Sequence, residues 1–218
     1  MLLLIDADIF CYRIGFACEN ESKKVACNTM SNFLTDIIED LVMDSDDETH
    51  EVELYLTGKG NFRFDYAVTA EYKGNRKKNK KPKHLQSLRD YLVKHHGAIV
   101  TQGEETDDRI AIRATQNPEA IIVSLDKDFH QLVCGHYNFV KKELMYITKK
   151  EAVYNFYMQF LVGDSADNIK GVMGIGPKKA AVLLKGKTEL QMYDICVDKL
   201  GSEERAIENG ILLHLRRE

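Results

Sequence analysis

No apolar run in this sequence approaches the length of a helix that crosses a bilayer, so it does not predict a transmembrane protein. The first six residues lack a basic lead-in and end in an acid, which argues against a secretory signal peptide. The five cysteines, an odd number, form no C-x-x-C pair, so a zinc site is not expected. We expect reduced thiols and a cytoplasmic location.

Patterns for catalysis by a side-chain nucleophile are also missing. No Ser-His-Asp or Cys-His spacing stands out, and the pair His95-His96 has no partner spaced like a metal ligand. Positive charge is scarce overall, since 30 basic residues face 34 acidic ones and the net charge is −4. That sign does not exclude nucleic acid, because acids that bind cations no longer repel a phosphate backbone. The distribution of charge along the chain is therefore more informative.

What the chain does contain is typical of an α/β protein. Its 218 residues fit one domain with an appendage, and 44% hydrophobic residues are enough for a core. Three short apolar runs predict buried parallel strands, and acids follow each of them. The runs are residues 2–5, 98–101 and 120–125. Because helical patterns alternate with these strands, we expect a parallel sheet whose carboxyl edge is crowded with carboxylates.

The acids at these strand ends exceed what helix capping requires. Four of them stand within residues 104–108, and Asp126 and Asp128 follow the third strand. They would repel one another unless cations bind, and oxygen-rich clusters suit Mg²⁺ or Mn²⁺. After the first strand, Asp6 is followed by Asp8, and the two share a side only if the chain stays extended. Capping of a following helix is the alternative for Asp6.

Residues 163–179 combine two further features. Asp164 and Asp167 are three apart, so on a helical turn both carboxylates would point the same way. Gly174-Ile175-Gly176 and Pro177 predict a tight turn that feeds a helix N-terminus, where free N–H groups bind phosphate. A helix cap and a plain loop are the alternatives. Carboxylates for metal beside a phosphate-binding turn favour an enzyme that holds nucleic acid and cuts it.

A basic segment precedes the second of the acid clusters. Residues 72–84 hold seven Lys or Arg and no acid. Such a run is often a solvated or mobile loop, and Pro82 fits that alternative. In an acidic protein, however, this concentration of positive charge would attract a phosphate backbone.

Helical spacing of apolar residues predicts core helices elsewhere. One covers residues 31–43, with Ser31 at its start, and another ends at His95-His96. An acidic loop at 44–51 precedes a strand at 52–56. A strand pair at 137–140 and 144–147 and helices at 151–162, 178–184, 190–200 and 203–215 complete the pattern. The last three helices would form a small appendage around the Gly-Ile-Gly turn.

In this order the motifs resemble the flap endonuclease and 5′-nuclease superfamily, close to its bacteriophage 5′→3′ exonuclease branch. The matching motifs are I-D-A-D at the start, E-Y-K-G-N-R at 71–76, E-x-D-D at 105–108, L-D-K-D-F at 125–129 and G-D-x-x-D-N-I-x-G-V-x-G-I-G-P-K-K-A at 163–180. The last motif is highly specific, and the others are individually weak. The resemblance implies a PIN-like α/β domain at 1–148 and a helix–three-turn–helix region at 149–218 that completes the active site. Residues 71–90 would form a basic arch that passes a single strand.

The resemblance also implies residue roles. One of two Mg²⁺ or Mn²⁺ ions would be surrounded by Asp6, Glu105, Asp107 and Asp108, and the other by Asp126, Asp128, Asp164 and Asp167. Lys73 and Arg76 would contact the scissile phosphate region, and Tyr72 would stack on the terminal base. Further DNA contacts would come from Lys77, Lys78, Lys80, Lys81, Gly174, Gly176, Lys178 and Lys179, in some members through a bound K⁺.

One position departs from the family pattern. The family carries a further Asp at the end of its second long strand, roughly where Thr57-Gly58 stands. Its absence would weaken the first ion site, and Asp8 is the candidate substitute.

Together these residues predict phosphodiester hydrolysis with two ions, in-line attack and a 5′-phosphate product. The expected partner is DNA with a 5′ end or flap, and the chain is expected to be a monomer. Two alternatives stay open. One is an RNase H-like or PIN-type ribonuclease acting on RNA or RNA–DNA hybrids, and the other is a DNA-binding module whose nuclease site has decayed.

Overall fold

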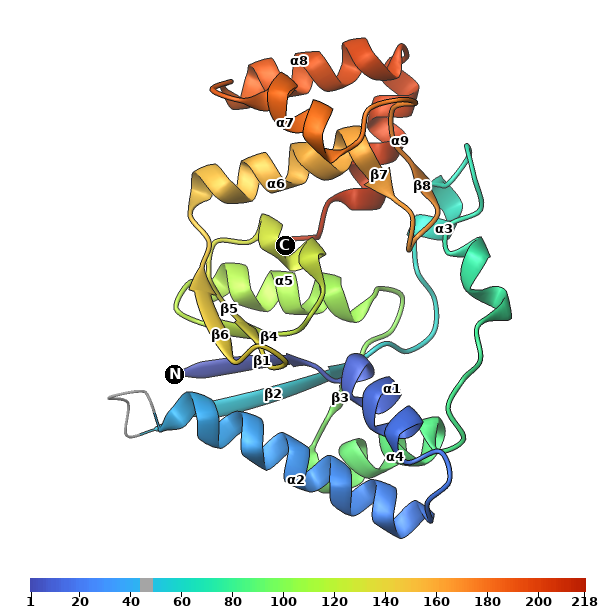
Figure 1. Ribbon diagram of the computed structural model, residues 1–218, viewed down its shortest axis with the longest axis vertical. Helices are drawn as coiled ribbons and strands as arrows, with labels where there is room; N and C mark the ends of the chain where they lie inside the picture. The colour runs from blue at the N-terminus through green and yellow to red at the C-terminus, as the bar shows by residue number, and fades with distance from the viewer. Residues whose placement is uncertain (44–48) are drawn as a thin grey trace.

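A computed structural model describes residues 1–43 and 49–218, so most of the predicted acidic loop at 44–51 lies outside it, as does the side chain of Lys78. Within the described residues, six strands form one sheet in the order β3-β2-β1-β4-β5-β6 (Figure 1). They are β1 Leu2–Asp6, β2 Glu51–Leu56, β3 Ile99–Val100, β4 Ile121–Val123, β5 Gly135–Asn138 and β6 Glu143–Tyr146. Neighbouring strands are parallel except β5 and β6. The predicted α/β class is confirmed.

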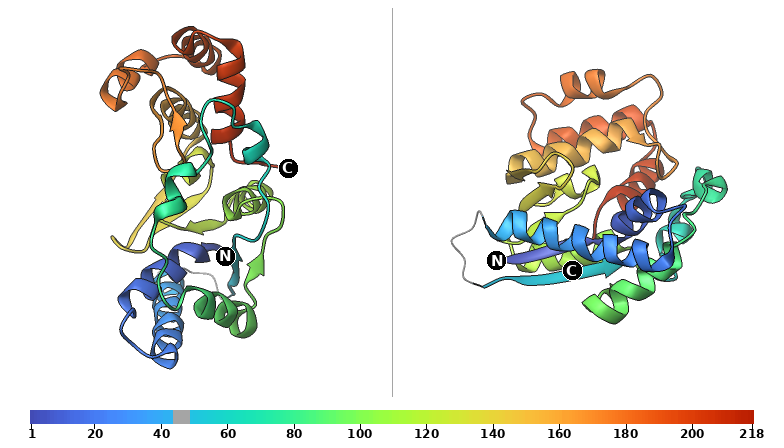
Figure 2. Two further views of the ribbon diagram at one scale, coloured as in Figure 1. Left: turned by 90° about the vertical axis from the view of Figure 1, so that its right-hand side faces the viewer. Right: turned by 60° about the horizontal axis from the view of Figure 1, so that its bottom comes forward.

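Strand β1 is buried on both faces, because successive side chains point to opposite sides of a sheet. Leu3 and Ile5 belong to one hydrophobic cluster and Leu4 to another. Helices α1 (Ala7–Ala17), α2 (Lys23–Val42) and α4 (Leu85–His96) cover the first face. Helix α5 (Thr106–Gln116) and the 3₁₀ turn η2 (Lys127–Gln131) cover the second face (Figures 1 and 2). With both faces covered, the strand ends are where polar side chains gather.

Helix α2 begins at Lys23 rather than at Ser31, as the sequence pattern predicted. Its cap is Ser22, whose hydroxyl accepts the N–H of Val25 at 3.3 Å. The first turns bury Ala26, Cys27 and Met30. Small and flexible residues give a weaker periodic signal than Leu or Ile. The sequence pattern therefore predicted too late a start for this helix.

A second group of helices lies beyond the α5 face of the sheet (Figure 1). It consists of α6 (Lys149–Val162), α7 (Pro177–Leu184), α8 (Glu189–Leu200) and α9 (Glu203–Leu213), which share one hydrophobic cluster. Thr148 and Thr188 each form a capping box at the start of α6 and α8. Pro177 occupies the first turn of α7, directly after Gly176. The predicted helical appendage around the Gly-Ile-Gly turn is confirmed.

Two short strands, β7 (Gly163–Asp164) and β8 (Ile169–Lys170), form an antiparallel hairpin between α6 and α7. Gly163 has a φ of 77°, and a Cβ atom there would stand 2.3 Å from the amide nitrogen of Gly171. Only glycine combines this backbone angle with such close approach. The hairpin therefore depends on Gly163.

The basic segment connects the two halves of the molecule. It follows α3 (Arg63–Tyr66), contains the 3₁₀ turn η1 (Gly74–Lys78), and runs along one side toward α4 (Figure 2). At one end the N–H of Lys73 donates to the carbonyl of Asp167 at 2.9 Å. At the other end the N–H of Lys83 donates to Glu19 Oε2 at 3.0 Å, beyond the end of α1. The segment thus spans from the β7–β8 hairpin to α1.

The last residues of the chain return to the sheet. Leu215 is buried in the cluster on the α5 face. Gln131 donates to the carbonyl of Leu213 at 2.9 Å and accepts the N–H of Leu215 at 3.0 Å.

The division of the chain into domains at 1–148 and 149–218 stays a prediction. Among the described residues, no helix has both the length and the apolar character needed to span a bilayer.

Candidate functional site

The carboxyl edge of the sheet gathers acids from three separate segments. Asp6 ends β1, Asp126 follows β4, and Asp107 stands in the first turn of α5, which follows β3. The hydroxyl of Ser124 donates to Asp6 Oδ2 at 3.1 Å and so joins the ends of β1 and β4. This is the edge at which parallel sheets bind their ligands.

Burial, and then repulsion between carboxylates, raises the pKa values of Asp6 and Asp107. Burial is the main cause for Asp6, and the nearby carboxylates of Asp8 and Asp126 add to it, so its pKa rises to about 7. For Asp107, burial and then the carboxylates of Asp6 and Asp126 raise the pKa well above its usual range. Glu105 adds to the same repulsion. Buried carboxylates that face one another without enough cations destabilise a fold.

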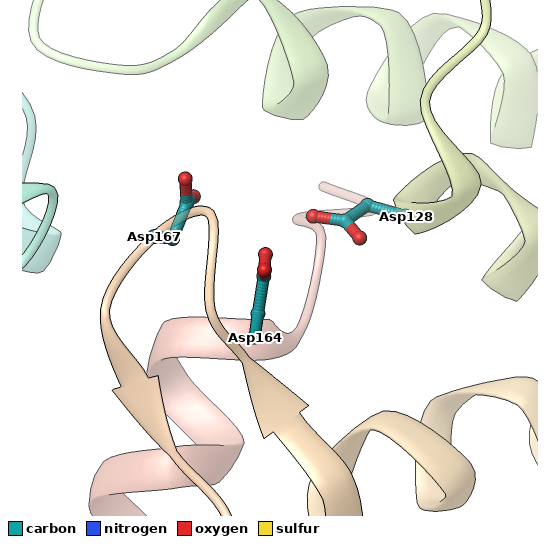
Figure 3. A group of neighbouring side chains, drawn as sticks. All are labelled: Asp128, Asp164 and Asp167. Carbon is teal, nitrogen blue, oxygen red and sulfur yellow. The ribbon is translucent and has the colours of Figure 1, made fainter. Parts of the chain in front are cut away.

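A second group consists of Asp128, Asp164 and Asp167, in which one carboxylate oxygen of each lies within 4.8 Å of the others. Asp128 reaches from η2 toward the two aspartates of the β7–β8 hairpin (Figure 3). Burial, followed by the carboxylates of Asp126 and Asp164, raises the pKa of Asp128 to about 7. The carboxylate of Asp126 thus raises pKa values in both groups. We refer to the two groups together as the acid cluster, which consists of Asp6, Glu105, Asp107, Asp126, Asp128, Asp164 and Asp167.

Asp164 and Asp167 come together for a reason other than the predicted one. They do not share a helical turn, because Asp164 ends β7 and Asp167 lies in the turn before β8. Asp164 Oδ1 accepts the N–H of Ala166 at 2.7 Å. Short polar side chains close turns by such bonds, so the same spacing suits a hairpin.

Asp108 requires a correction, because it does not join the acid cluster. Its carboxylate is fully buried and accepts both Nη1 and Nη2 of Arg63, at 2.5 and 2.8 Å. Arg63 also donates to the carbonyls of Leu212 and His214. Successive residues of a helix point about 100° apart, so Asp107 and Asp108 cannot both face the same site. Asp108 anchors the end of the chain instead.

The cationic side chains of the basic segment face the acid cluster. Lys73 pairs with Glu105 and lies 3.4 Å from Asp167, which also pairs with Arg76. Burial alone would lower the pKa of Lys73, but Glu105 and Asp167 hold it above its usual value. Tyr72 is 3% exposed and donates to both Glu105 and Asp167, at 2.7 and 2.8 Å. Its ring is therefore not free for the predicted stacking on a terminal base.

Other lysines of the basic segment lie on the surface. Lys77 pairs with Glu71 at 2.5 Å, and Lys80 pairs with Glu19 at 2.7 Å. Lys81 is exposed. The structure shows no contact between these three lysines and the acid cluster within the described residues.

The Gly-Ile-Gly turn has the open geometry that the sequence predicted. Gly174 adopts a φ of 77°, and Lys179 donates to its carbonyl at 2.8 Å. Apart from the adjoining residues, no atom of the described part of the chain lies within 4 Å of a Cβ position at Gly174 or Gly176, and Lys178 is exposed. The backbone of the turn is accessible to a ligand.

Several residues that hold the acids in place were not found from the sequence. Ser124 binds Asp6, Gln159 on α6 binds Asp128, Arg63 binds Asp108, and Arg89 on α4 binds Asp8. Each is a single polar residue within an otherwise ordinary helix or loop. No local pattern marks such a residue, because its partner is distant in the chain.

A cavity of about 400 Å³ opens at the acid cluster and is lined by Asp126, Asp128, Asp164 and Arg76, among others. A larger cavity, about 1160 Å³, lies at the amino edge of the sheet. There the acid Asp40 is already paired with Lys142 at 2.8 Å. The smaller cavity is the candidate site, because its carboxylates carry uncompensated charge.

The chemistry of the acid cluster fits divalent cations. Its side-chain donors are carboxylates, which Mg²⁺ and Mn²⁺ prefer. Asp6, Asp107 and Asp128 have raised pKa values, which a bound cation would lower again. Three of the carboxylates already converge on one point.

Known sequences match this chain over its sheet-bearing half and beyond. A sequence model for the family "5′-3′ exonuclease, N-terminal resolvase-like domain" matches residues 1–158. Flap endonuclease Xni of Shewanella pealeana is 35% identical over 140 residues, or 58% of this chain and 55% of that protein. Flap endonuclease Xni of Shewanella halifaxensis is 38% identical over 142 residues, or 58% of this chain and 56% of that protein. The match thus spans about half the length of these curated relatives.

Solved structures share the whole fold. The 5′-exonuclease of bacteriophage T5 with bound zinc has a TM-score of 0.73 at 21% identity, over 98% of this chain and 89% of that one. The bacteriophage T5 flap endonuclease in a pseudo-enzyme–product complex with DNA and metal ions has a TM-score of 0.70 at 22% identity, over the same shares. At this identity the likeness shows the fold, and it confirms the predicted PIN-like arrangement of a parallel sheet between helices.

Proposed function

This chain belongs to the family of 5′→3′ exonucleases with an N-terminal resolvase-like domain, and we propose that it is a structure-specific 5′-nuclease. In this proposal it hydrolyses DNA phosphodiester bonds at 5′ ends or flaps and leaves 5′-phosphate products. Two relatives are named flap endonucleases, and one structural neighbour was solved with DNA and metal ions. Both facts support DNA as the substrate class.

The observation that carries the proposal is the gathering of acids from four segments at the carboxyl edge of the sheet, close enough for their carboxylates to raise one another's pKa values. The segments are the end of β1, the start of α5, η2 and the β7–β8 hairpin. The raised pKa values of Asp6 and Asp128 mean that, once ionised above about pH 7, these acids lower the stability of the metal-free fold. Residues that cost stability and stand beside the cations Lys73 and Arg76 are expected at a site for phosphoryl chemistry.

In the proposed site, Asp6, Glu105 and Asp107 hold one Mg²⁺ or Mn²⁺ ion, and Asp126, Asp128, Asp164 and Asp167 hold the other. When bound, such ions activate water and neutralise charge on the phosphate. Lys73 and Arg76 then exchange their carboxylate partners for oxygens of the scissile phosphate and stabilise charge as it develops. Their pairing with Glu105 and Asp167 keeps them in position for this exchange.

The proposed DNA contacts extend from the acid cluster in two directions. Duplex DNA lies against the start of α7, where Gly174, Gly176, Lys178 and Lys179 offer open backbone and positive charge, with K⁺ as a further proposed ligand. A single strand follows the basic segment between the β7–β8 hairpin and α1. We propose a cytoplasmic monomer, and the five buried, unpaired thiols support a reducing compartment.

Product mapping on a 5′-flap DNA with Mg²⁺ tests the proposal. The wild type should release fragments with 5′-phosphates, whereas Asp126→Ala should abolish cleavage because Asp126 acts on both acid groups. DNA binding in Ca²⁺ should be largely retained in this variant. Asp36→Ala is the matched control, since Asp36 is an exposed acid on α2 and should leave cleavage unchanged.

The same assay separates the alternatives. A turn that binds the backbone does not read bases, so the Gly-Ile-Gly turn suits an RNA–DNA hybrid as well as DNA. Preferred cleavage of a hybrid over flap DNA would therefore favour a ribonuclease. Tight DNA binding with no Mg²⁺-dependent hydrolysis in the wild type would favour a decayed site. Cleavage that survives Asp126→Ala would contradict the assignment of the acid cluster.

A further inference from the structure

Helix α4 brings a cation to the carboxyl edge of the sheet that the proposed chemistry does not use. Arg89 forms an ion pair with Asp8 through Nη1, and its Nη2 donates to the carbonyl of Thr57 at 2.5 Å. The side chains of Arg89 and Asp8 are only 19% and 21% exposed. Arg89 therefore connects the first turn of α1 to the residue that follows β2.

The remaining contacts of Asp8 tie the pair to helix α5. Asp8 Oδ2 accepts the N–H of Thr57 at 2.7 Å and the hydroxyl of Thr106 at 3.4 Å. The hydroxyls of Thr57 and Thr106 also lie 2.7 Å apart. Thr106 begins α5 and stands between Glu105 and Asp107. The network thus reaches the two acids that α5 brings to the first ion site.

Asp8 stands close to that site although it is bound elsewhere. It is two residues from Asp6, in the first turn of α1, and it accepts the hydroxyl of Thr106 at the start of α5. Two further acids at this edge are paired as well, since Glu105 pairs with Lys73 and Asp108 with Arg63. The charge around the first site therefore depends on which of its acids have a cationic partner.

We propose that the Arg89–Asp8 pair sets the affinity of the first ion site, with Arg89 keeping Asp8 from contributing its charge. The inference rests on the proposed function, because it concerns one of the two proposed ions. With the pair intact, its two charges cancel near the site. Removing Arg89 leaves a free carboxylate that attracts a cation, and neutralising Asp8 leaves a free guanidinium that repels one. Arg89 acts through Asp8 and is a positioning residue.

The test measures Mn²⁺ binding to the whole chain without DNA, by the paramagnetic resonance signal of free Mn²⁺, well above the raised pKa values of the acids. Wild type, Arg89→Met, Asp8→Asn and the double variant are compared. We expect one ion, that of the first site, to bind about tenfold more tightly in Arg89→Met and about tenfold more weakly in Asp8→Asn. The double variant should return close to wild type, and the other ion should change little in all four proteins.

A merely structural role predicts a different pattern. If Arg89 only holds α1, β2 and α5 together, both single variants weaken the first ion and the double variant is no better. That result, or unchanged affinities in both single variants, would overturn the inference. If Arg89→Met does not fold, Asp8→Asn decides alone, since unchanged or tighter binding in that variant rejects the proposal.

Failure of this inference can be told apart from failure of the proposed function. The wild type could cleave flap DNA and bind two ions while both single variants shift the affinity of the first ion in the same direction. That outcome would reject only the role of Arg89. A wild type that neither cleaves nor binds two ions rejects the nuclease proposal itself.

Discussion

At the scale of single residues, crowding makes the acid cluster sensitive to pH. Asp6 and Asp128 have pKa values raised to about 7, by burial first and by neighbouring carboxylates second. Such a group must lose its proton before it binds a cation, so protons compete with Mg²⁺. We predict that the Mg²⁺ concentration for half-maximal cleavage rises as pH falls below 7. The rise should be up to about tenfold per pH unit for each competing proton.

Flap cleavage titrated with Mg²⁺ on both sides of neutral pH measures this dependence. Circular dichroism at each pH is the control for folding. An Mg²⁺ requirement that stays constant across the range would show that the acids ionise at their ordinary pKa values, and it would contradict the crowding described above.

Arg63 offers a test of a buried ion pair outside the acid cluster. Arg63 is 1% exposed and Asp108 fully buried, so neither charge can turn to water. Arg63→Met leaves Asp108 without its partner and should lower the free energy of unfolding by about 3–5 kcal/mol. Urea denaturation measures the change. The double variant Arg63→Met/Asp108→Leu should recover most of it, whereas a double variant as unstable as the single one would speak against charge burial as the cause.

The sequence predicted the acids of the site better than their partners. An acid after a buried apolar run lies at a strand end, so Asp6 and Asp126 could be placed from local pattern. Arg63 binds an acid 45 residues away and Arg89 one 81 residues away. Pairings of this kind depend on how the chain folds back on itself, and no spacing rule reveals them. Asp108 was misjudged for the same reason.

At the scale of elements, the β7–β8 hairpin depends on one glycine. A Cβ atom at Gly163 would lie 2.3 Å from Gly171 N and 2.5 Å from Ile169 O, both backbone atoms that cannot yield cheaply. Gly163→Ala should therefore cost roughly 2–4 kcal/mol of stability, from backbone strain together with overpacking. It should also abolish cleavage, because Asp164 is the next residue.

Gly201→Ala is the matched control for this prediction. Gly201 ends α8 with a φ of 71°, and among the described residues other than its neighbours in the chain, none has an atom within 4 Å of its Cβ position. Only the backbone strain of about 1 kcal/mol should appear, with cleavage intact. Urea denaturation and flap cleavage of both variants decide the matter, and equal effects at the two positions would refute the role given to the hairpin.

Regular elements were predictable where their apolar pattern is strong. The strands at the sheet centre and helices α4, α7 and α8 lie within two residues of their predicted bounds. The start of α2 and the β7–β8 hairpin were not predicted. In α2 the buried residues are small or flexible, and in the hairpin two-residue strands carry no period at all. Tertiary contacts rather than local pattern define both.

At the scale of the whole molecule, cations should bind the two halves together. The acid cluster draws Asp6 and Asp126 from the sheet and Asp164 from the helical group's hairpin. Because the second proposed ion needs Asp126 and Asp164 in place together, Mg²⁺ should raise the melting temperature. An ion at a hundredfold excess over its Kd adds about 2.7 kcal/mol, which corresponds to roughly 5–10 °C for a chain of this size.

The rise in melting temperature caused by Mg²⁺ should grow with pH, and the direction of this change follows from the raised pKa values. Acids whose pKa is raised in the fold stabilise it while protonated, and this contribution is lost as pH rises through about 7. Buried His136, with a pKa lowered by burial to about 4, acts in the opposite sense below neutral pH, with or without metal. Calorimetry with Mg²⁺ and with a chelator measures the rise in melting temperature that is due to the metal.

Asp128→Asn should reduce this rise. A rise that changes neither with pH nor in this variant would count against cation binding at the acid cluster.

The buried thiols give the molecule built-in reporters of its own opening. Cys11, Cys18 and Cys27 lie in the core of α1 and α2, Cys134 lies beneath α5, and Cys196 lies among the C-terminal helices. Burial raises the pKa of Cys11, Cys134 and Cys196 to about 12, so they resist alkylation while the fold is closed. Timed alkylation followed by peptide mass analysis would therefore reveal which layer loosens first, with no label added to the chain.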